Sequence, residues 1–323
     1  MTPDATRTDE YRGTGAASIP ATAIMAQAGA KASAENFPVA LRFLPRRYRG
    51  HLAAVYGFAR SVDDMGDQAA PEERLELLDE IEADLRRLYR MVPPAAGAGG
   101  PAGGAPAPAR GDPAAAGGPP RLAVIRALAP AVIGCAIPAQ PFHDLIAANR
   151  QDQVVSRYPA YGDLLEYCRL SANPVGRIVL HIFGAATPAR EVLSDRVCTA
   201  LQLAEHWQDV AEDLRAGRIY LPQEDLHRFG CSERDLAAPS AGPRVRALIA
   251  FEERRARELL DAGAPIVGTL RGAARAAVAG YVAGGRAALA AIAASGHDVL
   301  RTTPRPGPAR VAAELVRAYA TGR

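Results

Sequence analysis

The stretch RSVDDMGD (residues 60–67) has a counterpart in QLAEHWQDVAED (residues 202–213), and the two together decide the fold of this chain. In both, carboxylates recur four residues apart, which on a helix places them one turn apart on the same face. These carboxylates are Asp63 and Asp67 in the first stretch, and Glu205, Asp209 and Asp213 in the second. Both stretches therefore predict a helix with a row of like charges along one side.

Apolar residues surround both acidic rows, which indicates that neither row is a plain wet surface. The flanking residues are Tyr56, Phe58 and Val62 in the first stretch, and Leu201, Leu203, Trp207 and Val210 in the second. Like charges in such surroundings are destabilising unless cations lie between them. Oxygen ligands of this kind favour Mg²⁺, which keeps some of its waters and also binds substrate phosphates. The alternative is that each row is a solvated helix face, as most charge runs are.

The composition fits a globular protein without nucleic-acid partners. The chain has 323 residues, 49% of them hydrophobic, and a formal net charge of +3, which is too small to indicate nucleic acid. The four cysteines lack a CxxC spacing, which predicts reduced thiols in a cytoplasmic protein. We expect no transmembrane helix and no signal peptide, because the long apolar runs contain charges or prolines and acidic residues precede the first of them.

The apolar periodicity predicts helices and no convincing strand, so the chain is expected to be all-α. The predicted helices span about residues 36–65 (interrupted near Pro45), 71–88, 121–134, 140–156, 160–186, 189–215, 243–262, 266–297 and 309–320. Asn173-Pro174 is expected to kink the helix at 160–186. Residues 1–30 are expected to be a disordered tail, and residues 93–120, almost wholly Pro, Ala and Gly, a mobile surface loop.

In its order of motifs the chain resembles the squalene/phytoene synthase family, whose members have an all-α isoprenoid synthase bundle around a central active-site cavity. The resemblance covers about residues 35–300 and rests on the two acidic stretches, the GRIYLP segment at 217–222 and the segment from Tyr167 to Gly176. It implies one catalytic domain at 31–300, carrying the loop at 93–120, and a C-terminal tail at 301–323 with a short helix.

Two short segments resemble the hopanoid-pathway branch of that family, whose members convert presqualene diphosphate to hydroxysqualene. They are ENFPV at 35–39 and SANPVGR at 171–177, where phytoene synthases usually carry Gly-Thr in place of Asn173-Pro174. One position departs from the family pattern: Glu205 stands where Asn is common. A carboxylate there is still able to bind metal, but with tighter binding that would slow the release of diphosphate.

The resemblance implies a role for each residue that matches a family motif. The implied metal ligands, for two or three Mg²⁺ ions, are Asp63, Asp64, Asp67, Glu205, Asp209 and Asp213. The implied catalytic residues are Arg60, Tyr56, Tyr167, Arg218 and Tyr220. The implied substrate-binding residues are Phe37, Ala172, Val175, Gly176, Gln202 and Tyr281. Asp64 points about 100° away from Asp63 on a helix, so it is expected behind the ligands rather than among them.

Several of these residues have a purely structural alternative. Arg60 would hold the aspartates apart by a salt bridge, and Arg218 and Tyr220 would be ordinary turn residues. The aromatic residues would be core, as we expect for Trp207, and His206 is expected to pack rather than bind metal.

The implied reaction is Mg²⁺-dependent ionisation of presqualene diphosphate followed by capture of the cation by water. It needs no NAD(P)H, and no GxGxxG follows a predicted strand. The implied partners are a prenyl diphosphate, a membrane surface at the inner face during release of a lipid product, and other hopanoid-pathway enzymes.

Three other functions stay open at this point. The first is head-to-head condensation of two farnesyl or geranylgeranyl diphosphates. A terpene cyclase would usually carry a single DDxxD motif and a different metal triad, and an inactive relative serving as an assembly or scaffold protein would typically have lost one acidic row. Both rows are present here.

Overall fold

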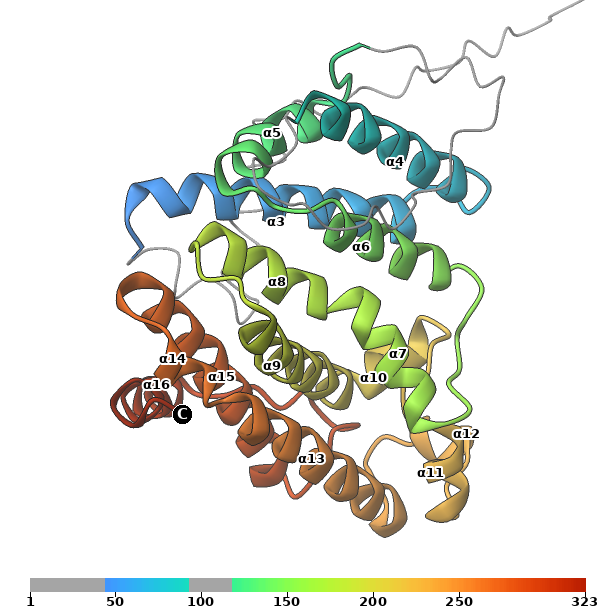
Figure 1. Cartoon of the computed structure of the whole chain (residues 1–323). Helices are drawn as coiled ribbons and strands as arrows, with labels where there is room; N and C mark the ends of the chain where they lie inside the picture. Colours follow the sequence, from blue (N-terminus) through green and yellow to red (C-terminus); the bar gives the residue numbers. More distant parts are fainter. Residues whose placement is uncertain (1–43, 93–117) are drawn as a thin grey trace, which may run out of the picture.

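Most of the described helices lie where the sequence shows apolar periodicity, and Figure 1 shows the resulting bundle. The structure is a computed structural model that describes residues 44–92 and 118–323. Within these ranges there is no strand, only an isolated bridge between Arg157 and Ile219, so the all-α prediction is confirmed. Phe37, the predicted tail at 1–30 and most of the predicted loop at 93–120 lie outside the described residues.

The helices run in the following order. They are α3 (Arg46–Asp67), α4 (Arg74–Met91), α5 (Ala123–Cys135), α6 (Gln140–Gln151), α7 (Tyr161–Ser171), α8 (Asn173–Ile182), α9 (Pro188–Gln208), α10 (Val210–Arg215), α11 (Gln223–Arg228), α12 (Glu233–Leu236), α13 (Pro243–Gly263), α14 (Ile266–Thr269), α15 (Gly272–Ala294) and α16 (Pro308–Thr321).

The kink that the sequence predicts at Asn173-Pro174 is present as a break between α7 and α8. Ala172 lies between the two helices with φ −113° and ψ −47°. Pro174 falls in the first turn of α8, where its missing N–H removes no helical hydrogen bond. The chain thus changes direction at the SANPVGR segment without a loop.

Two other predicted helices prove to be interrupted. The helix predicted at 189–215 breaks at Asp209, whose φ of −105° and ψ of 16° separate α9 from α10. The helix predicted at 266–297 breaks at Leu270, which is extended with φ −103° and ψ 162°. Apolar periodicity continues through both breaks, which is why the sequence pattern did not show them. The short helices α11 and α12 were not predicted, and the helices predicted at 140–156 and 160–186 end earlier, at Gln151 and Ile182.

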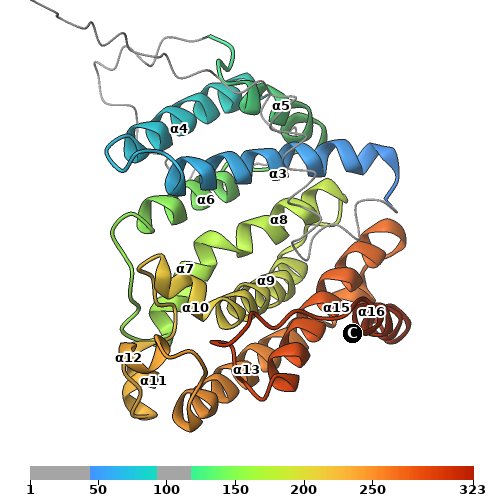
Figure 2. The ribbon, with the colours of Figure 1, turned by 180° about the vertical axis from the view of Figure 1, so that it is seen from behind.

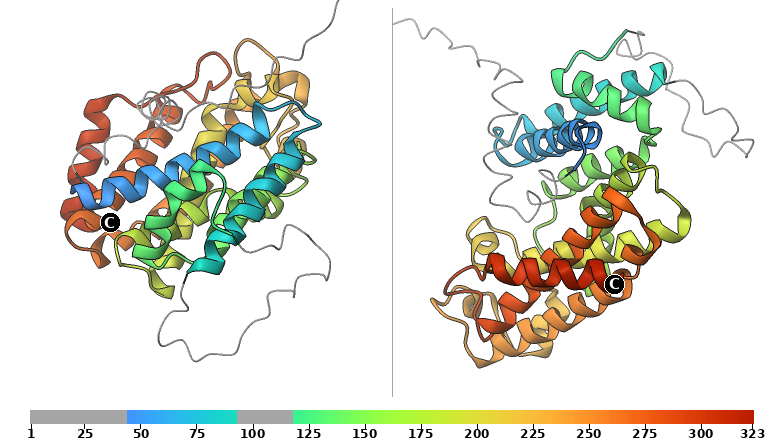
Figure 3. Two further views of the ribbon diagram at one scale, coloured as in Figure 1. Left: turned by 90° about the horizontal axis from the view of Figure 1, so that it is seen from above. Right: turned by 90° about the vertical axis from the view of Figure 1, so that its left-hand side faces the viewer.

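Two apolar clusters hold the bundle together, and α8 belongs to both. One cluster joins α3, α4, α5 and α6, and it receives Ile178 and Ile182 from α8. The other joins α7, α9, α13 and α15, and it receives Leu180 from α8. Figures 1 and 2 show α8 and α9 between the α3–α6 group and the α13–α16 group, and Figure 3 shows the same order from two further sides. Trp207 on α9 is fully buried, which confirms its predicted place in the core.

Helix α15 is the one described helix that is long and apolar enough to cross a membrane, by length and composition alone. Its most apolar window is 61% buried inside the protein, and Val282 and Leu289 have no exposed surface. A core helix passes the same test, so α15 gives no support for a membrane span. The four cysteines are free, with Cys168 and Cys231 buried.

Asp84 on α4 anchors the chain where α5 begins. Its side chain is buried, and its Oδ2 accepts hydrogen bonds from the backbone N–H groups of Arg121 and Leu122, both at 2.8 Å. It also forms an ion pair of 3.0 Å with the buried Arg87. Leu122, the N-cap residue of α5, has no side-chain cap of its own, so Asp84 supplies the acceptor that the first N–H groups lack.

We therefore expect Asp84→Asn to lower the free energy of unfolding by about 2–4 kcal/mol, because the buried Arg87 loses its counter-charge and one backbone donor loses its acceptor. The matched control is Asp79→Asn on the same helix, where the side chain is 72% exposed and pairs with Arg150. A surface pair of this kind contributes about 1 kcal/mol or less. Urea denaturation followed by circular dichroism measures both values, and equal losses would show that Asp84 is no anchor.

Candidate functional site

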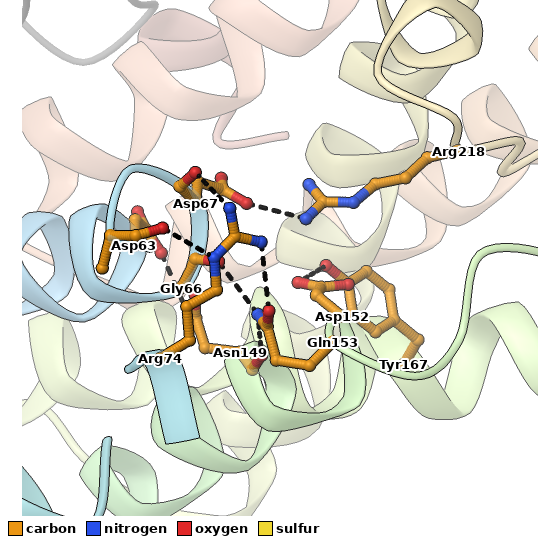
Figure 4. A network of polar contacts seen from close by, with 10 residues as sticks. Asp63, Gly66, Asp67, Arg74, Asn149, Asp152, Gln153, Tyr167 and Arg218 are labelled. Atoms are coloured by element: carbon orange, nitrogen blue, oxygen red, sulfur yellow. Dashed lines mark hydrogen bonds and ion pairs between the residues drawn. The ribbon is translucent and has the colours of Figure 1, made fainter. Parts of the chain in front are cut away.

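Arg218 links the two acidic stretches, at the C-terminal end of α3 and around the α9–α10 junction, because it pairs with Asp67 and also acts on Asp213. Figure 4 shows Arg218 reaching Asp67 beside Asp63. Arg218, which follows α10, crosses from the second stretch to the first and pairs with Asp67. Its Nη2 lies 2.7 Å from Asp67 Oδ1. A single ion pair thus links residues 151 positions apart in the chain.

A tight turn after α10 orients Arg218 toward Asp67. Gly217 has a φ of +82°, in the left-handed region that favours glycine, and it reverses the chain directly after the helix. The backbone N–H of Arg218 then donates to the carbonyl of Asp213 at 2.8 Å. Next to it, Ile219 donates to the carbonyl of Ser156 at 3.0 Å, which fixes the turn against the segment that follows α6.

Asn149 from α6 holds the side chain of Asp63 by a hydrogen bond. The Asn149 amide donates to Asp63 Oδ1 at 3.2 Å and to the carbonyl of Leu145 at 3.2 Å. Asp63 is exposed as a whole residue, while its carboxylate lies close to the protein. Burial of this carboxylate raises the pKa of Asp63 to about 6, although the hydrogen bond from Asn149 acts in the opposite direction. The adjacent charges of Asp67 and Asp64 raise the pKa further.

The second acidic row carries uncompensated charge as well. Burial, and after it the neighbouring Asp209, raises the pKa of Asp213 to about 7, while Arg218 works against this increase. Burial also raises the pKa of Asp209, with a contribution from Glu212. The Oδ1 atom of Asp209 is buried without a hydrogen-bond partner in the described part of the chain. Buried carboxyl oxygens are normally paired, so this one oxygen of Asp209 is available to a bound cation.

A further carboxylate, Asp152, lies near Arg218, Asp67 and Asp63, and no sequence motif pointed to it. It caps the C-terminus of α6, and its Oδ2 accepts a hydrogen bond from the Tyr167 hydroxyl at 2.9 Å. Burial raises the pKa of Asp152 to about 6, against the effect of the Tyr167 hydrogen bond. The only available signal was the recurrence of polar residues in the second half of the helix predicted at 140–156, where Asn149 and Asp152 are three residues apart.

An aromatic cluster stands behind Asp152. Tyr220 and His206 stack with their ring centroids 3.7 Å apart, and Tyr167 lies 5.8 Å from Tyr220. Tyr158 lies 5.5 Å from Tyr167 and completes the cluster. His206 is buried in this stack, and burial lowers its pKa to about 3, so it remains neutral. The prediction that His206 packs rather than binds metal agrees with this placement.

The structure places the remaining predicted residues as follows. Arg60 pairs with Asp64 at 2.6 Å, and Gln68 also donates to Asp64, so both of these Asp64 contacts lie within the α3 end of the chain. Gln202 contacts His206 at 3.2 Å, and Glu205 lies on the exposed side of α9. Ala172 is buried, and Val175 packs against the apolar cluster of α3 to α6. Tyr56 is half-buried on α3.

Gly176 and Tyr281 line a small apolar cavity of about 30 Å³ between α8, α9, α14 and α15. The other lining residues are Val179, Leu180, Ser194, Val197, Cys198, Leu201, Ile266 and Val278. The structure thus brings two of the predicted substrate residues together from distant segments. Ala172 and Val175 do not line this cavity.

The carboxylates fit Mg²⁺ without forming a ready-made cage. Across residues 44–92 and 118–323, no three His, Cys, Asp or Glu side chains converge on one point. Mg²⁺ does not require such a cage, because it binds through one or two carboxylates together with waters and substrate phosphates. The donors here are oxygens only, and the unpartnered Oδ1 of Asp209 and the raised pKa values of Asp63 and Asp213 indicate missing positive charge. The donor set therefore fits a hard divalent cation that arrives with a phosphate ligand.

Comparison with known proteins places this site in a family. A sequence profile of the squalene/phytoene synthase family matches residues 30–311. A hydroxysqualene synthase from Sinorhizobium fredii is 33% identical over 243 residues, which cover 73% of this chain and 72% of that protein. A phytoene synthase from Mycobacterium tuberculosis is 30% identical over 241 residues, covering 73% of this chain and 70% of that protein. The crystal structure of a squalene synthase from Alicyclobacillus acidocaldarius shares 37% identity and a TM-score of 0.69, covering 86% of this chain and 97% of that one.

The raised pKa values of three carboxyls predict a pH dependence of the metal-free protein. Asp63, Asp152 and Asp213 have pKa values of about 6, 6 and 7, against the ordinary value of 3.8. Between about pH 4 and pH 7 the folded protein therefore holds protons that the unfolded chain has released, so stability falls as pH rises through this window. The melting temperature in a chelating buffer should decrease from pH 5 to pH 8, and Asp213→Asn should flatten the decrease. A wild-type curve no steeper than that of the variant would contradict this.

Gly66 leaves room for the amide that holds Asp63. A Cβ at Gly66 would lie 2.6 Å from Asn149 Oδ1 and 3.3 Å from Gln153 Nε2. Gly66→Ala should therefore displace Asn149 and lower the free energy of unfolding by about 1–3 kcal/mol. Gly57→Ala is the control, because it lies on the same helix with nothing within 4 Å of its Cβ. That variant should gain about 0.5–1 kcal/mol from helix propensity, and a similar gain at Gly66 would refute the close contact.

Proposed function

Because the chain belongs to the squalene/phytoene synthase family, we propose that it ionises presqualene diphosphate with the help of Mg²⁺ and adds water to the resulting cation, which gives hydroxysqualene. The observation that carries this proposal is the meeting of two acidic rows at one site, with Arg218 between them. Two opposed rows of carboxylates suit a polyanionic leaving group that is bound through cations. The SANPVGR segment and the similarity to a hydroxysqualene synthase support this substrate and product.

Asp63 and Asp67 would hold Mg²⁺ from α3, and Asp209 and Asp213 from the α9–α10 junction. When bound, the metal ions neutralise charge on the diphosphate and act as Lewis acids as its C–O bond breaks. Arg218 is a cation that the chain itself provides at this place, where it pairs with Asp67. Its guanidinium is able to exchange Asp67 for phosphate oxygens, to which it would donate a fork of hydrogen bonds. Arg60 would contribute in the same way after leaving Asp64.

The aromatic cluster would shield the cation that remains. The faces of Tyr167 and Tyr220 attract positive charge through their quadrupoles. Burial raises the pKa of both phenols above the ordinary value of 10.0, so their hydroxyls remain protonated and are poor nucleophiles. Tyr56 and Tyr281 would extend this lining toward the prenyl chain. The apolar cavity beside Gly176 would accommodate part of that chain once neighbouring side chains move.

A second candidate is head-to-head condensation of two prenyl diphosphates. The similar identity to a phytoene synthase, over nearly the same length, favours it. Both reactions begin with ionisation at the same two acidic rows, so the rows alone do not separate them. An inactive scaffold protein is disfavoured, because both rows and Arg218 are present in the folded site.

A cytoplasmic location, with membrane contact at the inner face during product release, forms part of this proposal. Hydroxysqualene is a lipid, and α16 carries apolar residues on its outer side. Val316 is 70% exposed and Tyr319 is 45% exposed. This surface also suits contact with other enzymes that handle the same lipid.

The test is incubation with presqualene diphosphate and, separately, with farnesyl diphosphate, in each case without NADPH and with or without Mg²⁺. We expect hydroxysqualene from presqualene diphosphate only, with one oxygen from ¹⁸O-labelled water by mass spectrometry. Asp63→Asn and Asp209→Asn should each lower turnover about 100-fold or more while circular dichroism remains helical. Asp79→Asn, at the surface of α4, should retain full turnover.

Two outcomes would overturn the proposal. Condensation of two farnesyl or geranylgeranyl diphosphates, with presqualene diphosphate left intact, would favour the second candidate. Full turnover in a chelating buffer would refute the role of the acidic rows.

A further inference from the structure

Asp152 differs from the other carboxylates of the site in its contacts. It belongs to neither acidic row and comes from the end of α6. Its Oδ2 accepts the Tyr167 hydroxyl at 2.9 Å. Its Oδ1 is buried and has no hydrogen-bond partner among the residues that the structure describes. One oxygen is thus fixed by a neutral donor, and the other is left for a group that arrives with the substrate.

The charged groups around Asp152 act on it at a distance. Arg218, Asp67 and Asp63 influence it through space, with Arg218 opposing the two carboxylates. The residues behind it are the aromatic rings of the Tyr167 cluster, and burial there favours the neutral acid. The surroundings of Asp152 therefore favour uptake of a proton by its carboxylate. While it is charged, it also attracts a cation formed beside it.

We propose that Asp152 is the base of the water-capture step, with its Oδ1 accepting the proton of the water that traps the carbocation. This inference rests on the proposed function and assigns one residue to its last step. The water oxygen forms a C–O bond to the cationic carbon, and one O–H bond of that water breaks. The proton passes to Asp152 and later to solvent, so carbocation, carboxylate and water become alcohol and carboxylic acid. No oxidant or reductant is required.

The other groups near the cluster are less suited to this step. Tyr158, Tyr167 and Tyr220 have pKa values raised by burial, so they are protonated and do not accept a proton. His206 is stacked on Tyr220 and contacts Gln202, and its low pKa makes it a weak base. Asp67 is paired with Arg218, and Asp63 accepts from Asn149. The hydrogen bond from Tyr167 fixes the orientation of Asp152. In the same way, a third group orients the base in sites that pair a nucleophile with a base.

The test compares two rates in the same reaction: release of diphosphate and formation of ¹⁸O-labelled alcohol. Asp152→Asn keeps the size of the side chain and the acceptor for Tyr167, but it does not take up a proton. We expect diphosphate release to stay within about tenfold of wild type. The alcohol formed per diphosphate should fall about 100-fold, in the range that a general base contributes, with hydrocarbons from proton loss in its place.

Glu252→Gln is the matched control, because Glu252 is another buried carboxyl with an unpartnered oxygen, on α13 beside Arg255. That variant should leave the alcohol per diphosphate unchanged. Should Asp152→Asn fail to fold by circular dichroism, Asp152→Glu replaces it. The displaced carboxylate should lower the same ratio by about tenfold or more.

Each remaining outcome overturns the assignment. Equal loss of diphosphate release and alcohol would place Asp152 in the binding of diphosphate or metal instead. An unchanged ratio would make another group the base, such as the departing diphosphate. If wild type leaves presqualene diphosphate untouched, the proposed function itself fails, and the role of Asp152 fails with it.

Discussion

Repulsion between neighbouring carboxylates is the constraint on which this site depends. Arg218 pairs with Asp67 of the first acidic row and acts on Asp213 of the second, and burial raises the pKa of Asp63, Asp209 and Asp213. The chain offsets the charge in part, with Arg218 on Asp67 and Asn149 on Asp63. These contacts leave Asp209 Oδ1 unpaired, so the folded protein retains an affinity for cations that its own side chains do not satisfy.

The helix breaks at Asp209 and Ala172 help to place the residues of the site. Asp209 interrupts the ladder between α9 and α10, yet the N–H of Asp213 still donates to its carbonyl at 2.9 Å, so the acidic row continues across the break. The short α10 then ends at Gly217, whose positive φ turns Arg218 back toward α3. The break at Ala172 lets α8 share both apolar clusters while α7 places Tyr167 against Asp152. The interruptions at Asp209 and Ala172 thus adjoin segments that carry residues of the site, while the long helices α9, α13 and α15 form the core.

The sequence was sufficient for the features that depend on periodicity. Buried positions at Leu52, Val55, Phe58 and Val62 recur every three or four residues, so both α3 and the row on its opposite side were predictable. The breaks at Asp209 and Leu270 were not predictable, because apolar periodicity continues through them. Asn149 and Asp152 were missed for another reason. Each acts through one contact to a residue distant in sequence, Asp63 or Tyr167, and only the packing of α6 against its neighbours brings them into reach.

The family to which the chain belongs indicates that diphosphate departs from the substrate, but it does not indicate which product the cation then forms. Relatives named hydroxysqualene synthase and phytoene synthase match this chain at 33% and 30% identity, so similarity of this degree accompanies more than one named activity. The product depends on which groups surround the cation after the C–O bond breaks. Protonated phenols stabilise it without reacting, whereas a carboxylate with a free oxygen directs a water toward it. In this chain Asp152 combines that free oxygen with a fixed position against Tyr167, so the choice between alcohol and hydrocarbon is expected to lie at the end of α6 rather than in the acidic rows.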